Sequence, residues 1–238
     1  MRADKFLFHK KKLGKKAAQR AIAEGRLWVN DQQVSHAGHE IEKFDQVRFD
    51  AEILVERHAR YIMLHKPAGY VCATSDELSP TVLELLQETA EPLHLAGRLD
   101  KFTTGLVLLT NDGRWSREIT MPESKVAKVY LVKAEKPIES QMVEAFEKGI
   151  FFEKEKVKTQ PADVKLIAPT QMELTIYEGM HHQIKRMLLK FNNRVVSLHR
   201  KSIGILHLDL PEGEFRELTE KELSGMRKIC SPEEPHTV

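Results

Sequence analysis

The stretch that most constrains the fold is residues 96–113, AGRLDKFTTGLVLLTNDG. Its second half, from Gly105 to Thr110, is a short aliphatic run that predicts a buried strand, and the Asn-Asp-Gly after it predicts a tight turn. Directly before this strand stand an arginine, a carboxylate and two hydroxyl groups: Arg98, Asp100, Thr103 and Thr104. A cation and an anion at the entrance of a core strand need either a structural or a chemical reason.

Charge is unevenly distributed along the chain. The formal net charge is +2 over 238 residues, yet residues 1–26 contain nine Lys or Arg and only two acids, so they carry +7 and the rest carries −5. A basic cluster of this kind raises the affinity for polyanions by releasing their condensed counterions, which favours a nucleic-acid partner. A solvated helix face is the alternative interpretation.

Other features exclude several classes of protein. No run of 18 apolar residues occurs, and the N-terminus MRADKFLFHKKK is unlike a signal peptide, so we expect a cytoplasmic protein without a membrane partner. Cys72 and Cys230 form no CxxC pair, which is typical of reduced thiols. Without HExxH, GxGxxG or GxxxxGK[ST], neither a metal nor a nucleotide cofactor is expected. His181 and His182 are adjacent and poorly placed to chelate one metal, so we expect a hydrogen-bonding role for His182.

The N-terminal residues predict one compact unit. Small apolar residues recur at helical spacing from Ala17 to Ile22 with basic residues on the other side, which predicts a basic amphipathic helix that ends near Gly25. The following residues alternate around Asn30-Asp31, as in a short hairpin, and a further strand is expected at 46–49. The polar stretch 51–60 then predicts an inter-domain linker.

The rest of the chain reads as mixed α and β structure. Several strands follow one another without an intervening helix, which favours antiparallel pairing. We expect strands at 61–64, 105–110, 126–134, 164–167, 173–177, 195–198 and 203–208, and helices at 80–88, 139–148 and 182–190. The expected division is a first domain at 1–55, a linker at 56–60, a second domain at 61–230 and a disordered tail at 231–238.

The segments RADKFL, AAQRAIAEGRLWVNDQQV and DQVRF together resemble the S4-like RNA-binding module over about residues 1–50. The resemblance implies a helix pair and a small strand pair that present basic side chains to RNA. Where the family has Ser-Arg before its helix, this chain has Lys15-Lys16. The implied RNA contacts are Arg2, Lys5, Lys15, Lys16 and Arg20.

Five further segments carry chemistry: HKPAGYV at 65–71, GRLDKFTTGLVLLTNDG at 97–113, KVYLV at 128–132, EGMHHQIKRML at 178–188 and SLHRKSIG at 197–204. Each alone has a structural explanation, such as a turn, a loop salt bridge or a basic helix face. In this order they closely resemble the RsuA-type pseudouridine synthases, which modify bacterial ribosomal RNA. The resemblance implies an α+β architecture, in which a small S4-like α/β RNA-binding domain precedes a mixed, largely antiparallel-sheet synthase domain.

The resemblance also implies roles for particular residues. The Arg-Leu-Asp-x-x-Thr-x-Gly-Leu motif assigns the catalytic aspartate to Asp100, with Lys185 as its basic partner and Tyr130 as the residue that stacks on the flipped uracil. Leu198 closes the pocket and Arg98 supports the RNA. The other implied substrate contacts are Thr103, His182, Gln183 and Arg186. Met180 stands where the family usually has an arginine, so one positive contact to RNA is missing.

The chemistry is consistent with these assignments. Conversion of uridine into pseudouridine breaks the N1 glycosidic bond, turns the uracil and rejoins it through C5 without a change in redox state, so no cofactor is required. A carboxylate can act as nucleophile or base if it stays ionised in a pocket that excludes water, and a nearby cation offsets the cost of that burial. The base must also leave its stack, where an aromatic face can hold it.

The leading hypothesis is a monomeric RNA isomerase that acts on small-subunit rRNA or an assembling subunit, at uridine-516 of 16S rRNA. The HQIKRM segment favours this substrate over 23S rRNA, which remains an alternative. A non-catalytic RNA-binding ribosome-assembly protein is a second class, and a nucleoside hydrolase or glycosylase is a third.

Overall fold

The computed structural model describes residues 1–86 and 92–230, so the tail expected at 231–238 lies outside the described residues. The chain divides into two compact units, Met1–Ala59 and Arg60–Val238. Each unit is described by itself below. In the part of the chain that is described, no helix has the length and apolar character needed to span a bilayer.

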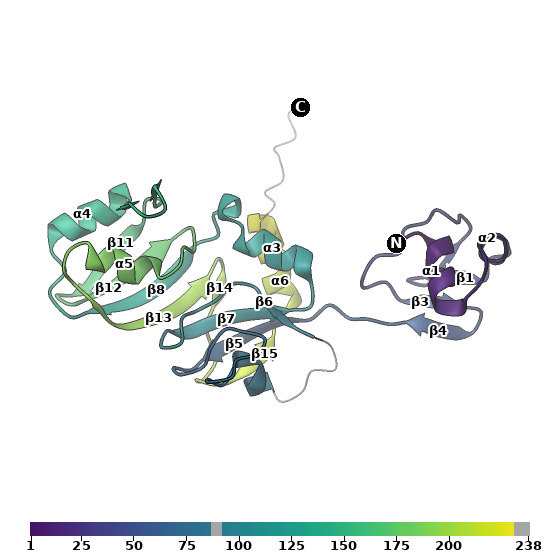
Figure 1. Ribbon diagram of the computed structural model, residues 1–238, viewed down its shortest axis with the longest axis horizontal. Coiled ribbons are helices and arrows are strands. Elements are labelled where there is room, and N and C mark those ends of the chain that lie inside the picture. The colour runs from purple at the N-terminus through teal and green to yellow at the C-terminus, as the bar shows by residue number, and fades with distance from the viewer. Residues whose placement is uncertain (87–91, 231–238) are drawn as a thin grey trace, which may run out of the picture. The chain divides into compact units, whose positions relative to one another are not determined.

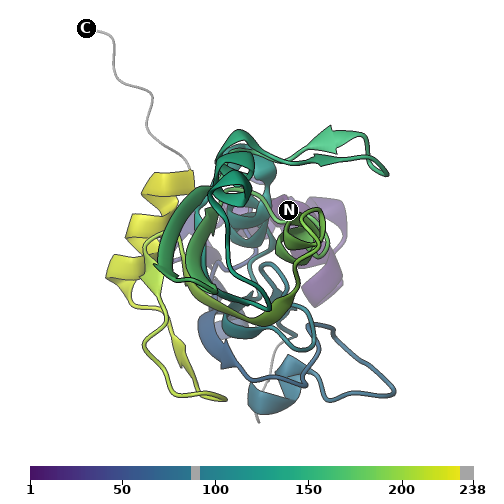
Figure 2. The same ribbon diagram turned by 90° about the vertical axis from the view of Figure 1, so that its left-hand side faces the viewer.

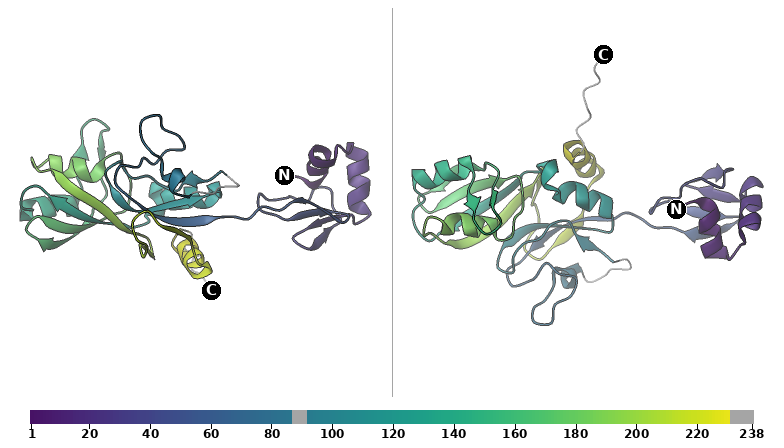
Figure 3. Two further views of the ribbon diagram at one scale, coloured as in Figure 1. Left: turned by 90° about the horizontal axis from the view of Figure 1, so that it is seen from below. Right: turned by 45° about the horizontal axis from the view of Figure 1, so that its top comes forward.

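The N-terminal unit is a helix pair against a small antiparallel sheet (Figure 3). The sheet has the strand order β2-β1-β3-β4. Its elements are α1 (Ala3–Lys11), α2 (Lys15–Ala23), β1 (Leu27–Val29), β2 (Gln32–Val34), β3 (Val47–Phe49) and β4 (Glu52–Val55).

Local sequence explains most of this unit. The predicted amphipathic helix is α2, which buries Ala18, Ala21 and Ile22 and leaves its lysines in solvent. The predicted hairpin joins β1 to β2, where Asn30 and Asp31 have φ of 49° and 62°. Two successive residues with positive φ are typical of the type I′ turn, and Asn and Asp tolerate this conformation better than other non-glycine residues.

The stretch 51–60, from which the linker was predicted, begins with a strand that precedes the expected linker at 56–60. Residues Glu52–Val55 form β4, which pairs antiparallel with β3. Leu54 and Val55 pack against the unit's core, while Glu52 and Ile53 are exposed. This strand was not predicted, although three of its four residues are aliphatic.

The second unit is built on a nine-stranded sheet (Figure 1). The main strand order is β11-β12-β8-β13-β7-β5-β15, with β14 beside β13 and β6 beside β7. All pairs in the described sheet are antiparallel except β13 with β7, which confirms the largely antiparallel architecture. The strands are β5 (Tyr61–Lys66), β6 (His94–Leu95), β7 (Thr104–Thr110), β8 (Lys128–Ala134), β11 (Asp163–Ala168), β12 (Gln171–Ile176), β13 (Val195–Ile203), β14 (Leu206–His207) and β15 (Phe215–Glu217).

Helices flank this curved sheet, as Figure 2 shows in a view turned by 90°. In Figure 1, α4 and α5 lie beside the end formed by β11, β12 and β8, and α3 and α6 lie near β7 and β14. Apolar side chains from β5, β7, β8, β12, α4 and α5 form the main core. The remaining elements are α3 (Gly113–Thr120), α4 (Ser140–Lys148), α5 (Gln183–Leu189), α6 (Glu220–Cys230), the 3-10 helices η1 (Val82–Leu86) and η2 (Pro122–Ser124), and the small hairpin β9 (Phe151–Phe152) and β10 (Val157–Lys158).

Two local predictions need correction. The α-helix expected at 80–88 is only a 3-10 helix, Val82–Leu86, and its last two residues lie outside the described residues. Thr81 forms a bridge with Val71 and donates its backbone N–H to Glu84 Oε1 at 2.8 Å, so the chain is held extended where the α-helix was expected to begin. The turn expected after β7 is instead the start of α3, because Asp112 accepts hydrogen bonds from the backbone of Arg114 and Trp115.

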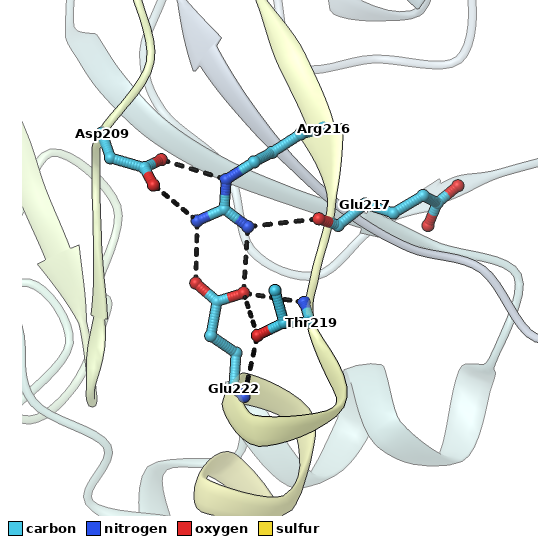
Figure 4. A network of polar contacts seen from close by, with 5 residues as sticks. All are labelled: Asp209, Arg216, Glu217, Thr219 and Glu222. Atoms are coloured by element: carbon cyan, nitrogen blue, oxygen red, sulfur yellow. Dashed lines mark hydrogen bonds and ion pairs between the residues drawn. The ribbon is translucent and has the colours of Figure 1, made fainter.

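Helix α6 was not predicted, although its first residues contain a recognised start signal. Thr219 and Glu222 form a capping box: the Glu222 carboxylate accepts the Thr219 backbone N–H at 2.8 Å, and the Thr219 hydroxyl accepts the Glu222 N–H at 3.3 Å. Arg216 on β15 lies between this carboxylate and Asp209 (Figure 4). The network attaches the helix to the edge of the sheet.

Gly105 is required by the parallel pairing in the centre of the sheet. It has φ of 109° and lies opposite Arg200 of β13, and a Cβ atom there would approach the Arg200 carbonyl oxygen to 2.3 Å. Only glycine accepts both the backbone conformation and this close approach. The pairing brings the loop before β7 next to β13.

Candidate active site

A pocket opens where four segments of the second unit meet: the loop before β7, strand β8, the start of α5 and strand β13. The residues of interest that line it are Arg98, Asp100, Thr103, Lys128, Tyr130, His182, Gln183, Lys185, Leu198 and Arg200. Among the described residues of this lining, Asp100 is the single carboxylate. The other charged side chains of the lining are cationic, and the rest are neutral polar or apolar.

Asp100 is held between two basic side chains of the same segment. Lys185 Nζ donates to Asp100 Oδ2 at 2.5 Å, and His182 Nε2 lies 3.2 Å from Asp100 Oδ1. The Asp100 side chain is 27% exposed, so solvent or substrate reaches it. Arg98 is close in sequence, yet its side chain is exposed and no ion pair joins it to Asp100 in the described structure.

The start of α5 explains how two residues three apart reach one carboxylate. The predicted helix begins one residue later than expected, at Gln183, because His182 has φ of 52° and stands outside the helix. The rings of His181 and His182 stack at 3.8 Å. Gln183 is buried and binds Glu178 Oε1 through Nε2 and the Met180 N–H through Oε1, which fixes the preceding loop.

Tyr130 and Leu198 lie on paired central strands and face the same pocket. Tyr130 on β8 is 7% exposed and lies opposite Arg200 of β13, while Leu198 lies opposite Val132. The Tyr130 hydroxyl accepts a hydrogen bond of 3.3 Å from Arg200 Nη1. An aromatic face and an aliphatic side chain are thus presented beside the carboxylate.

Sequence reasoning did not assign a role to Arg200, although its segment was singled out. Its side chain donates to the backbone carbonyls of Leu106 at 2.7 Å and Arg98 at 3.5 Å, besides the Tyr130 contact. Arg200 is 2% exposed, and the described residues provide no carboxylate partner for it. Its Nη2 and the Thr103 Oγ1 are buried without a hydrogen-bond partner in the described structure.

Lys128 is a second residue that was missed. It lies two residues before Tyr130 on β8, so the period of a strand places both on one face, and this spacing in KVYLV could have identified it. Its ammonium donates to the Val126 carbonyl at 2.8 Å. Burial and, second, the nearby Arg200 cation together lower the pKa of Lys128 to about 8.

Arg186 does not enter this pocket. Its guanidinium binds Glu155 at 2.6 Å and stacks 3.8 Å from the centre of the Phe152 ring. Met180, which stands at the position where the resemblance led us to expect an arginine, packs against the core of the unit.

The remaining candidates belong to the N-terminal unit. Arg2 binds Asp4 at 2.9 Å and, through this hydrogen bond, lowers the pKa of that carboxyl to about 2. Arg20 pairs with Glu24, and Lys5, Lys15 and Lys16 are exposed. Arg2, Lys5 and Lys15 line one shallow depression together with Phe8. The described residues contain no cluster of three His, Cys, Asp or Glu side chains suited to a metal ion.

Comparison with known protein families identifies both units. Residues 60–190 match the RNA pseudouridylate synthase family, and residues 1–47 match the S4 domain. The chain belongs to the RNA pseudouridylate synthase family and is an RNA pseudouridine synthase with an N-terminal S4 RNA-binding domain.

Individual relatives are similar over nearly their whole length. The chain is 46% identical to the ribosomal small subunit pseudouridine synthase A of Pseudomonas aeruginosa and 45% identical to that of Escherichia coli, over 95% of this chain and 100% of each relative. A crystal structure of a pseudouridylate synthase superimposes with a TM-score of 0.67 at 39% identity, over 95% of this chain and 99% of that one.

Proposed function

We propose that this enzyme converts one uridine of small-subunit rRNA into pseudouridine, with Asp100 as the catalytic carboxylate. The observation that carries the assignment is the placement of Asp100 between Lys185 and His182, in a pocket whose other charged side chains are cationic. A carboxylate that served only to bind RNA would repel the phosphate backbone. Its presence there is explained by chemistry.

Each candidate residue has a distinct task in this proposal. Lys185 and His182 fix the orientation of the Asp100 carboxylate through their contacts with its two oxygens, while the bound nucleotide excludes water. Tyr130 stacks on the flipped uracil and Leu198 closes the pocket over it. Arg98 and Thr103 contact the RNA around the displaced nucleotide, and Gln183 holds the loop that carries His182.

The reaction balances without a co-reactant. The N1–C1′ bond breaks, the electron pair leaves with the uracil, and the ring turns until C5 faces C1′. A C5–C1′ bond then forms and C5 loses its proton, while N1 gains one. Asp100 takes part either as nucleophile at the sugar or ring or as the base of an elimination, since all three routes need the same carboxylate.

The substrate assignment rests on the relatives. Enzymes that are 46% and 45% identical to this chain are named ribosomal small subunit pseudouridine synthase A, and the similarity covers 100% of each of them. We therefore assign the substrate as 16S rRNA, free or in an assembling subunit, with uridine-516 as the target. A cytoplasmic monomer is the form we expect to act on it.

The N-terminal unit is assigned to RNA binding outside the reacting nucleotide. The side chains assigned to contact RNA are Arg2, Lys5, Lys15, Lys16 and Arg20. They are five of the nine basic residues within residues 1–26, which carry a net charge of +7. Arg186 is assigned to the RNA path beyond the pocket, because its ion pair with Glu155 is only partly shielded from solvent. A phosphate could displace that carboxylate.

The direct test is incubation of the protein with 16S rRNA that carries C5-tritiated uridine. Pseudouridine formation releases tritium from C5 while the RNA keeps its mass, and mapping of the modified nucleotide gives the position. Release from 23S rRNA alone would favour the large-subunit alternative. Loss of a base would indicate a glycosylase, and binding without release would indicate an assembly protein.

A variant tests the role of Asp100. Asp100→Asn keeps the size of the side chain and removes the charge and nucleophilicity, so tritium release should fall below detection. RNA binding should persist or tighten, because the neutral amide no longer repels phosphate. The free energy of unfolding, measured by thermal melting, should change by about 0–1 kcal/mol, because a partly exposed ion pair contributes no more than that. Normal release by a folded Asp100→Asn variant would overturn the assignment.

A further inference from the structure

The inference concerns the turn that carries Asp100. The Thr103 backbone N–H donates to the Asp100 carbonyl at 3.0 Å, which closes a four-residue turn with Lys101 and Phe102 at its tip. The two residues at the base of the turn, Asp100 and Thr103, line the pocket. Whatever occupies the pocket therefore lies next to the tip.

Phe102 is the most exposed phenylalanine among the described residues, with 74% of its surface in solvent. Burial of a phenylalanine side chain stabilises a fold, and this fold gains almost none of that stabilisation from Phe102. Single exposed apolar residues are common on protein surfaces, so exposure alone indicates nothing. The position of this ring, two residues from the proposed catalytic carboxylate, is what indicates a role in substrate binding.

The backbone on both sides of Phe102 is held by a buried cation. Lys66 has no exposed surface, and its Nζ donates to the Lys101 carbonyl at 3.0 Å and the Thr103 carbonyl at 2.8 Å. The Gly69 N–H also donates to the Lys101 carbonyl, at 2.9 Å. Phe102 is thus an exposed ring on a backbone turn that hydrogen bonds hold in place. Because this turn is already ordered, less conformational entropy is lost on binding.

The charge around the ring favours an anionic, aromatic ligand. Lys101 Nζ lies 5.8 Å from the centre of the Phe102 ring and donates to Ser79 Oγ at 2.9 Å. Arg98 is exposed at the adjoining edge of the pocket. An exposed aromatic ring with one cation over it and a second cation at the neighbouring pocket fits an unstacked nucleobase together with its phosphate.

We propose that Phe102 is a binding site for the base adjacent to the target uridine, on which it stacks while the uridine occupies the pocket. When the uridine leaves its stack, its neighbour loses a stacking partner, and the ring supplies a new one. The neighbour is joined to the target by a single phosphodiester, so its site must adjoin the pocket, as the tip of the turn does. This inference rests on the proposed function, since it needs a flipped uridine beside Asp100.

The test is a thermodynamic cycle between protein and RNA. Short substrates of the target region are prepared with an intact nucleotide or an abasic site on the 5′ or the 3′ side of the target uridine. Binding is measured with wild type and Phe102→Ala. Phe102→Ala and the abasic site next to the uridine each remove the same stack, so each alone should weaken binding about tenfold. On the side of the uridine that stacks on Phe102, the two changes together should weaken binding little more than either one alone.

Two matched variants identify the cause. Phe102→Trp keeps an aromatic face and should retain wild-type binding, whereas Phe215→Ala removes an exposed phenylalanine of β15 and should leave binding of every substrate unchanged. Losses that multiply on both sides of the uridine, or unchanged binding by Phe102→Ala, would overturn the inference. If instead wild type releases no tritium from C5-labelled 16S rRNA, either free or in an assembling subunit, the proposed function has failed, so tritium release distinguishes the two failures.

Discussion

At the scale of single residues, the pocket sets one carboxylate among several cations. Arg98, Lys128, Lys185 and Arg200 all line it, and Lys185 alone among these four pairs with Asp100. This excess of positive charge suits an RNA nucleotide, whose phosphates enter with the base. It also favours a negative charge that develops on the uracil as its glycosidic bond breaks.

Arg200 connects three parts of this site, and we predict that it acts as a positioning residue. Arg200→Lys keeps the charge but loses the planar fork that reaches Leu106, Arg98 and Tyr130, so kcat should fall about tenfold. The measurement is tritium release at saturating RNA, with thermal melting to establish that the variant is folded.

A second variant tests the route of this effect. Tyr130→Phe removes the hydroxyl that Arg200 contacts, so Arg200→Lys should cost less in the Tyr130→Phe background than in wild type. Strictly additive losses in the double variant would show that Arg200 does not act through Tyr130.

At the scale of elements, short motifs set helix starts that hydrophobic periodicity did not reveal. Asp112 caps α3 and the Thr219–Glu222 capping box starts α6, and both signals are visible in the sequence. The Glu222 carboxylate also accepts two hydrogen bonds from Arg216, at 2.8 and 2.9 Å. These contacts, first those from Arg216, lower the pKa of Glu222 from an ordinary 4.5 to about 2.

This network predicts a defined dependence of stability on pH. A carboxyl whose pKa is lowered by folding stabilises the protein above its unfolded pKa, and the contribution is lost as the pH falls from about 4.5 towards 2. Glu222→Gln should therefore lower the free energy of unfolding by about 1 kcal/mol at pH 7, as expected for a partly exposed charged hydrogen bond. The difference from wild type should shrink below pH 4.

Urea denaturation of both proteins across this range is the measurement. Glu220→Gln is the matched control, because Glu220 is an exposed residue of the same helix. A difference between wild type and Glu222→Gln that stays constant from pH 7 to pH 3 would contradict the role assigned to the network.

At the scale of the whole molecule, the chain combines a small basic unit with a larger one that contains the pocket. The local charge of +7 lies entirely in the S4 domain, whose helices expose Lys5, Lys15 and Lys16. Contacts of this kind with phosphates strengthen binding without reading the RNA sequence. The S4 domain should therefore contribute affinity, while the second unit selects and modifies the nucleotide.

Removal of residues 1–59 tests this division, because these residues form the first compact unit and all residues that line the pocket belong to the second. The shortened protein should bind rRNA more weakly, and its affinity should depend less steeply on salt. As a control in the full chain, replacement of Lys15 and Lys16 by glutamine should lower the salt slope by about one to two ion equivalents without loss of fold. Filter binding over a range of salt concentrations decides this, and an unchanged slope in both proteins would refute the assigned role.

The sequence by itself determined the class of fold and most local structure, because those depend on neighbours in the chain. The alternation around Asn30-Asp31 predicted the hairpin, and the apolar run after Gly105 predicted β7. It also placed Asp100, Tyr130 and Lys185 in segments of one site, through motifs with fixed spacing.

Only the tertiary structure decided which side chains meet. Lys185 and Asp100 are 85 residues apart, and their contact depends on the left-handed conformation of His182 and on the packing of α5, neither of which is a property of a short segment. The burial of Arg200 likewise follows from the register of β13 against β7 and β8. This register depends on segments far apart in the chain, so the local sequence does not determine it. Along the chain the cations nearest to Asp100 are Lys101 and Arg98, whereas the fold brings Lys185 and His182 into contact with it, since distance in space and not along the chain sets electrostatic interaction.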